Sequence, residues 1–164
     1  MAVTIVVEDG TGKTDATSYI SIAEFKAYWT QNGVDYTGET DDTIALWVNN
    51  GTRYADSYYC YGGSVANDDQ ALLVPRVGWY DARGNSLDNS VPTQLKNAVC
   101  ELSGIRQAQR ATTETTGIKS KSAGPISVTY SNASMGARVK YTGADAYMKG
   151  LLCSGGASMT ALPR

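Results

Sequence analysis

Apolar residues recur with the period of a helix in three stretches of the chain. In the clearest stretch they share one helix face: Val91, Leu95, Ala98, Val99, Leu102 and Ile105. Ser90 is placed to cap the start of this helix, and Pro92 suits a first helical turn, where an N–H would have no partner. The pattern predicts a helix from about residue 91 to residue 105, with a polar continuation to residue 110.

Two helices are predicted earlier in the chain. Ser21 and Glu24 have the spacing of a capping box, which opens a helix through about Thr30. Residues 40–42 begin a second helix. A glycine in mid-helix costs on the order of 1 kcal/mol relative to alanine, so Gly51 predicts that another helix approaches closely. The apolar stripe of this helix consists of Ile44, Trp47, Val48, Gly51, Tyr54, Ala55 and Tyr58.

Tyrosines cluster at the end of the second helix, where four of the 11 in the chain fall between residues 54 and 61. Tyrosine offers a rigid aromatic surface with a polar tip, so the cluster could stack on nucleic-acid bases or bind a protein partner. Burial against the third helix is the simpler account, and we favour it.

Two parts of the chain outside the predicted helices have the sequence features of β-strands. Residues 3–7 are rich in β-branched side chains and predict a short strand, followed by a polar loop over residues 8–17. Residues 118–122 and 126–130 alternate on either side of Ala123-Gly124-Pro125. That arrangement predicts a β-hairpin.

Together these elements predict a mainly α (α+β) fold, with a small antiparallel bundle of about three helices, a C-terminal β-hairpin and an extended C-terminal arm. Residues 143–152 predict a short helix after the hairpin, and residues 154–164 predict a flexible arm that orders on a partner. The change of period near residue 116 divides the chain into a helical core, residues 1–116, and a second part, residues 117–164.

The connection between the second and third helices is predicted to be extended. Pro75 holds Val74 in an extended conformation, which argues against a helix through this point. Asp81 to Asn85 has the residue types of a turn. Arg76 carries a rigid fork of donors and is expected to bind carbonyls or a carboxylate. A bond within the subunit is favoured over one to a neighbouring subunit.

The residues of this connection and of the third helix resemble a phage family. The order Asp-Gln-x-Leu-x-x-Pro-Arg, a turn with Asp and Gly, and then a helix with Pro, Ala and Glu-Leu is similar to phage head-tail connector proteins. These are often labelled DnaT-like single-stranded-DNA-binding proteins. Many members have Trp where this chain has Val74, so the pocket for that ring must be smaller or be filled otherwise, for example by Trp79. The resemblance covers roughly residues 15–110, and its carriers are Asp69, Gln70, Leu72, Pro75, Arg76, Asp81, Gly84, Pro92, Ala98, Glu101 and Leu102.

The resemblance implies a structural role in the virion of a tailed phage, as a head-tail connector, adaptor or head-completion protein. Such a protein forms a ring of twelve copies in the virion neck, after assembly in the host cytoplasm. The expected partners are copies of the chain, the portal protein, and tail or tail-completion proteins. Residues expected at interfaces or in structural roles are Pro75, Arg76, Trp79, Tyr147, Leu151 and Leu162. The alternative, which follows the family's label, is a single-stranded-DNA-binding protein.

Charge is unevenly distributed along the chain. Residues 1–100 hold 13 acidic and 6 basic side chains, whereas residues 101–164 hold 3 acidic and 8 basic ones. Lysines on exposed strands often only deter edge pairing. The overall pI of about 5.1 favours the connector over an autonomous DNA-binding protein. Lys119 and Lys121 share a predicted strand face and Arg138 and Lys140 repeat their spacing, which makes these four the candidate residues for non-specific contact with packaged DNA.

The composition argues against an enzyme, and no catalytic residue, cofactor or metal site is predicted. The chain has no histidine, the commonest general base and metal ligand. Gly12-Lys13-Thr14 lacks the earlier glycine that a phosphate loop needs, because Val7 stands there. Cys60, Cys100 and Cys153 predict neither a disulfide framework nor a metal site, and Cys100 is expected in the core. No apolar run reaches the ~20 residues of a membrane span, and the N-terminus lacks the pattern of a signal peptide, so the chain is expected to be cytosolic on synthesis.

Overall fold

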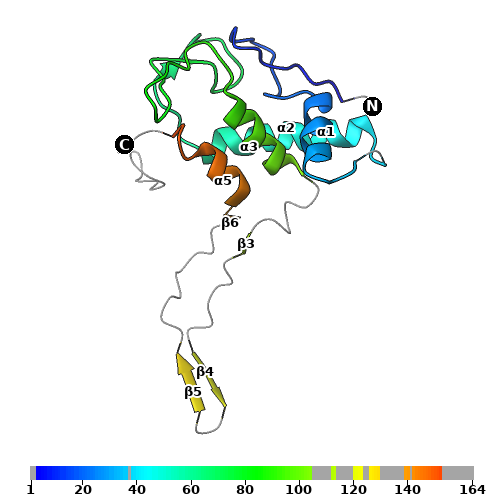
Figure 1. The fold of residues 1–164 in the computed structure, drawn as a ribbon, viewed down its shortest axis with the longest axis vertical. Coiled ribbons are helices and arrows are strands. Elements are labelled where there is room, and N and C mark those ends of the chain that lie inside the picture. Colours follow the sequence, from blue (N-terminus) through cyan, green and yellow to red (C-terminus); the bar gives the residue numbers. More distant parts are fainter. Residues whose placement is uncertain are drawn as a thin grey trace.

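The computed structural model describes residues 3–36, 38–104, 112–113, 120–123, 126–129, 139–140 and 142–152. Within these residues the chain is mainly helical, with short antiparallel strand pairs, and the predicted α+β class is confirmed (Figure 1). The C-terminal arm predicted over residues 154–164 lies outside the described residues. The helices are α1 (Ile22–Gln31), α2 (Asp41–Tyr58), α3 (Thr93–Ser103) and α5 (Thr142–Met148), and the strands pair as β1 (Ser64–Val65) with β2 (Arg76–Val77), β3 (Thr112–Thr113) with β6 (Val139–Lys140), and β4 (Ser120–Ala123) with β5 (Ile126–Thr129).

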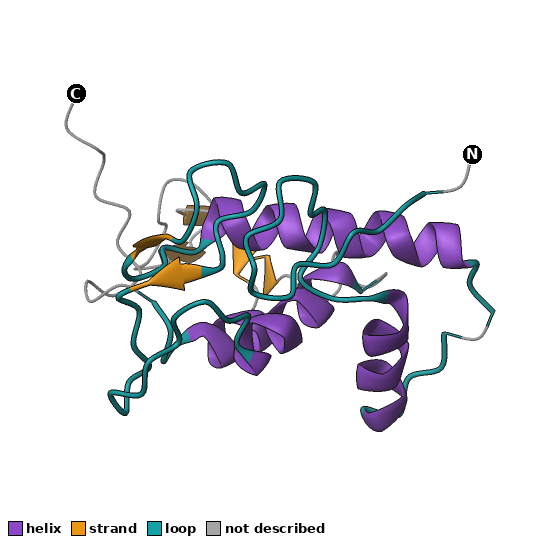
Figure 2. Ribbon diagram, turned by 90° about the horizontal axis from the view of Figure 1, so that it is seen from above, coloured by secondary structure: helices purple, strands orange, loops and turns teal. Residues whose placement is uncertain are grey.

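The core forms where α3 packs against both α2 and α5, with α1 at one end of α2 and the loops between α2 and α3 gathered at the other (Figure 2). The predicted close approach at Gly51 is confirmed. A Cβ on Gly51 would lie 2.0 Å from Ser103 Oγ and 3.0 Å from the Val99 carbonyl oxygen, so α3 crosses α2 at this glycine. Cys100 is also buried in the core, as predicted, and burial raises the pKa of its thiol to about 12.

The ends of α1 and α2 follow the sequence signals. Both hydrogen bonds of the predicted capping box between Ser21 and Glu24 are present. Thr40 caps α2 through a hydrogen bond from the N–H of Thr43. These bonds satisfy N–H groups that a helix start leaves without a partner.

Three local predictions are wrong. Ser90 does not cap α3, because its hydroxyl donates to the Leu87 carbonyl at 2.7 Å, and Pro92 occupies the cap position without a side-chain bond. Tyr54 does not join the buried stripe of α2 and is 47% exposed. Residues 3–7 form no strand and contribute only a parallel bridge between Val7 and Ser18.

Other parts of the connection agree with prediction. The turn at Asp81 forms through a bond from the Arg83 N–H to Asp81 Oδ1 at 2.9 Å, and Gly84 takes the positive φ of 84°. In the tyrosine cluster Tyr59 and Tyr61 are buried, which favours the structural account for these two.

Residues 142–152 belong to the helical core in space. Met148 and Leu151 are buried in the same cluster as the side chains of α2 and α3. Leu152 forms an antiparallel bridge with Tyr61. The division of the chain near residue 117 stays a prediction, but the short helix after it packs on α3.

One cysteine differs from expectation. Cys60 is disulfide-bonded, which the spacing of the three cysteines did not predict. Within the described residues, no helix is long and apolar enough to cross a membrane.

Candidate functional site

Pro75 and Arg76 lie in the connection between α2 and α3. The Val74–Pro75 peptide bond is cis, and Val74 and Pro75 are buried. The Arg76 guanidinium donates to the carbonyl oxygens of Leu73 at 3.0 Å and Gly63 at 2.8 Å, and Nε donates to that of Gly62. Arg76 therefore links loops of its own chain, as a planar fork of donors can.

Asp56 of α2 joins this connection to the N-terminal part of the chain. Asp56 Oδ1 accepts from the Tyr19 hydroxyl at 2.7 Å, and Oδ2 accepts from the Leu73 N–H at 3.2 Å. The Tyr19 hydroxyl in turn accepts from the Val74 N–H at 3.1 Å. Burial raises the pKa of the Asp56 carboxyl, although the hydrogen bonds from Tyr19 and Leu73 work against that rise. Burial also raises the pKa of Tyr19, which keeps its hydroxyl protonated and able to donate.

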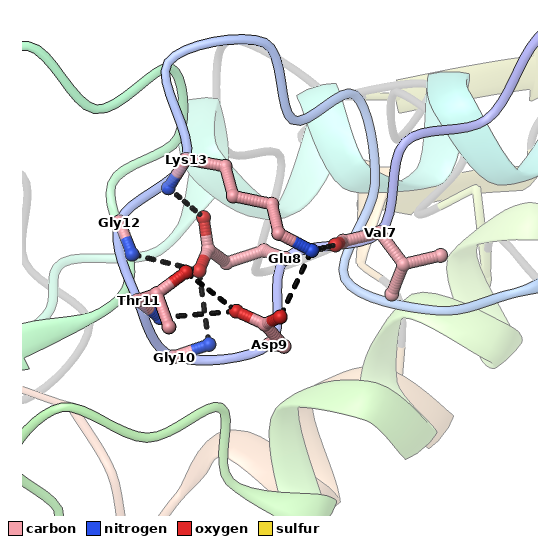
Figure 3. Close-up of polar contacts among 7 residues, drawn as sticks. All are labelled: Val7, Glu8, Asp9, Gly10, Thr11, Gly12 and Lys13. Atoms are coloured by element: carbon pink, nitrogen blue, oxygen red, sulfur yellow. Dashed lines mark hydrogen bonds and ion pairs between the residues drawn. The ribbon is translucent and has the colours of Figure 1, made fainter.

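Glu8 lies at the centre of the N-terminal loop, and its side chain points into the ring of backbone formed by residues 8–13 (Figure 3). The residue is 1% exposed. Glu8 Oε1 accepts from the N–H groups of Gly10 and Gly12, both at 2.9 Å, and Oε2 accepts from the Lys13 N–H at 2.8 Å. Such a concave set of N–H groups can bind an anion, and in this loop the anion is a carboxylate of the same chain.

The loop also packs on its neighbours. The Lys13 ammonium donates to the Val7 carbonyl at 2.8 Å and pairs with Asp9 at 2.9 Å. A Cβ on Gly12 would lie 2.2 Å from Asn67 Nδ2, so a larger residue there would displace the Asn67 side chain, which donates to the Thr11 carbonyl. The Gly12-Lys13-Thr14 sequence is thus part of a loop whose N–H groups bind the Glu8 carboxylate.

The other candidate residues that the structure describes lie around α5. Trp79 is 1% exposed, and its indole N–H donates to the Leu151 carbonyl at 2.9 Å. Tyr147 is half-buried, and its hydroxyl lies 3.1 Å from that of Tyr28, which donates to Glu101 at 2.7 Å. Trp79, Tyr147 and Leu151 therefore make contacts within the chain. Leu162 lies outside the described residues.

The segment between α3 and α5, residues 105–141, is called the basic segment. It contains Arg106, Arg110, Lys119, Lys121, Arg138 and Lys140 and one acidic residue, Glu114, for a net charge of +5; the rest of the chain carries 8 basic and 15 acidic residues, for −7. The described strands of this segment pair with one another, β3 with β6 and β4 with β5. In Figure 1 the β4–β5 pair lies at the end of the molecule remote from the helices.

The predicted hairpin is confirmed by the pairing of β4 with β5. Of the four candidate DNA-facing residues, Lys121 lies in β4 and Lys140 in β6, whereas Lys119 and Arg138 lie outside the described residues. Within the described part of the chain, no group of three or more Cys, Asp or Glu residues is arranged to hold a metal ion.

The fold and the charge distribution define a mainly helical domain with a basic, strand-containing segment between its last two helices. The chain belongs to the family described as "Putative DnaT-like ssDNA binding protein", whose model matches residues 3–164. No curated protein matches the chain, and no solved structure matches it.

This family assignment corrects the expected role. The head-tail connector interpretation is wrong, because the family that matches almost the whole chain is described by single-stranded-DNA binding, the alternative. Portal and tail partners, a ring of copies and a part in virion assembly have no support from the match.

The residues that carried the resemblance have another explanation. The Gln70 amide accepts from the N–H groups of Ala66 and Asn67 and donates to the carbonyls of Leu72 and Pro75. Ala98 and Leu102 are buried in the core. In this chain, therefore, these residues hold the connection between α2 and α3 together and fill the core.

Proposed function

We propose that this protein binds single-stranded DNA through its basic segment. The observation that carries the proposal is the family match over residues 3–164, taken with the charge of +5 concentrated in residues 105–141. Single-stranded-DNA-binding proteins bind the backbone with basic side chains and release counterions as they do so. The remainder of the chain is acidic and repels the same phosphates, so binding is confined to one part of the molecule.

The overall charge of −2 does not oppose this proposal. Salt screens exposed charges beyond about 8 Å at physiological ionic strength, so a DNA strand responds to the charges it touches. The net charge of the whole chain therefore says little about DNA binding, because it is the sum of a basic segment and an acidic remainder.

We also infer that the protein acts by binding, without catalysis. In the described part of the chain, the buried Glu8 carboxylate accepts hydrogen bonds within its own loop, and the half-buried Asp56 carboxylate accepts hydrogen bonds from Tyr19 and Leu73. A general base needs a lone pair available to a substrate, and these two carboxylates use theirs to hold backbone N–H and tyrosine O–H groups.

The test is the affinity of the full-length protein for a fluorescent dT30 oligonucleotide, measured by anisotropy across a salt series. A duplex of the same length is the control. If the four candidate residues of the basic segment each neutralise one phosphate, log Kobs falls against log salt with a slope of about −2.8, a loss of about 50-fold between 50 and 200 mM salt. Binding with no salt dependence, or no binding at 50 mM salt, would overturn the proposal.

A further inference from the structure

The pairing of β4 with β5 defines a two-stranded ribbon with two faces. Its register places Ser120 opposite Thr129, Lys121 opposite Val128, Ser122 opposite Ser127, and Ala123 opposite Ile126. Opposed residues of an antiparallel pair share a face, and successive residues alternate between faces. Positions 121, 123, 126 and 128 thus form one face, and positions 120, 122, 127 and 129 form the other.

The two faces differ in chemistry. The second face carries hydroxyl residues at all four positions, Ser120, Ser122, Ser127 and Thr129. The first face, called the Lys121 face, combines one cation with Ala123, Ile126 and Val128. Apolar residues beside a basic one offer both a phosphate contact and an apolar surface for a base, whereas a hydroxyl face offers hydrogen bonds to phosphates but no charge and little apolar area.

We propose that single-stranded DNA lies along the Lys121 face of the ribbon, with a phosphate at Lys121 and a base against Val128 and Ile126. This inference rests on the proposed function and adds the face and the residues of contact. The positive charge that attracts the DNA phosphates is concentrated around the ribbon. The ribbon lies in the basic segment, which holds six of the 14 basic residues and one of the 16 acidic residues of the chain.

A charge-swap variant tests the face directly. Lys121→Ser combined with Ser122→Lys moves the positive charge by one position, to the other face, and keeps both the composition and the net charge. Anisotropy with dT30 at 0.1 M salt should show about a fivefold loss of affinity and a salt slope smaller by about 0.7, the contribution of one phosphate contact on a single strand. Lys121→Ala should show the same loss, and Lys121→Arg should bind like the wild type.

Two further variants separate the apolar contribution. Val128→Ser should weaken binding without changing the salt slope, because it removes apolar contact area and no charge. Ser127→Ala, its control on the other face, should bind within twofold of the wild type. Far-UV circular dichroism checks that each variant keeps the helices.

The outcomes distinguish this inference from the proposed function. If the wild type binds DNA and the charge-swap variant binds equally well, the face is wrong and the proposed function stands. If Ser127→Ala loses as much affinity as Val128→Ser, the face is again wrong. If the wild type itself does not bind, both fail.

Discussion

Gly51→Ala tests the packing of α2 on α3. In an exposed helix this change would stabilise by about 1 kcal/mol, because alanine has the higher helix propensity. At Gly51 the new Cβ would lie 2.0 Å from Ser103 Oγ and 3.0 Å from both the Ser103 N and the Val99 carbonyl oxygen. Two of these three atoms are backbone, so the helices have to move apart.

Overpacking a core costs typically 1–3 kcal/mol, and the backbone contacts place this site at the upper end. After the gain in propensity, we expect a net loss of about 2 kcal/mol in the free energy of unfolding. That loss corresponds to a Tm lower by roughly 4–8 °C for a chain of this length. Urea unfolding followed by tryptophan fluorescence measures it, since Trp29 and Trp79 are both buried.

Two variants serve as controls for Gly51→Ala. Asn50→Ala changes an exposed neighbour on α2 and should stabilise slightly through helix propensity. Adding Ser103→Ala to Gly51→Ala removes the 2.0 Å contact but keeps the two at 3.0 Å, so it should restore only part of the loss. A Gly51→Ala protein more stable than the wild type would refute the close approach of α3.

Three further results are expected. Glu8→Gln places an amide donor against a backbone N–H of the loop and should cost about 2 kcal/mol in the free energy of unfolding by urea, whereas Asp15→Asn, an exposed change in the same loop, should cost little. Hydrogen bonds from Thr11, and then from Lys13, lower the pKa of Asp9 from 3.8 to about 2. The stability that Asp9 contributes is therefore present above pH 3.8 and lost as the pH falls towards 2. Unfolding curves measured at pH 5 and at pH 2 should differ less for Asp9→Asn than for the wild type. Thiol titration without reductant should find one reactive cysteine, Cys100, and only after unfolding, because Cys60 is disulfide-bonded and Cys100 is buried. A peptide map should link Cys60 to Cys153, because Tyr61 and Leu152, the residues that follow Cys60 and precede Cys153, form a bridge.

Periodicity predicted the helices because each buries a face over several turns. The apolar stripe from Leu95 to Leu102 and the capping box at Ser21 each depend on residues close together in the sequence, and the structure contains both. Gly51 was informative for a similar reason, since only a close neighbour explains a glycine in mid-helix. Tyr54 was misplaced because a wide apolar stripe does not reveal which of its edges faces solvent.

Contacts between residues far apart in the chain could not be predicted from the sequence. Glu8 lies in a polar loop and gives no sign of burial, because its partners are backbone N–H groups, which every residue type except proline carries. The disulfide at Cys60 lies next to the bridge between Tyr61 and Leu152, which joins residues 91 positions apart in the chain. The candidate DNA-binding residues were found from charge and alternation, and the division of the ribbon into two faces required its register.

Whether the basic segment binds DNA is decided by the salt dependence of dT30 binding, compared between the full-length protein and a variant. The variant has alanine in place of Lys119, Lys121, Arg138 and Lys140. For the wild type we predict a slope of log Kobs against log salt of about −2.8, and for the variant a slope near zero. Equal slopes for the two proteins would contradict the assignment of the phosphate contacts to these four residues of the basic segment.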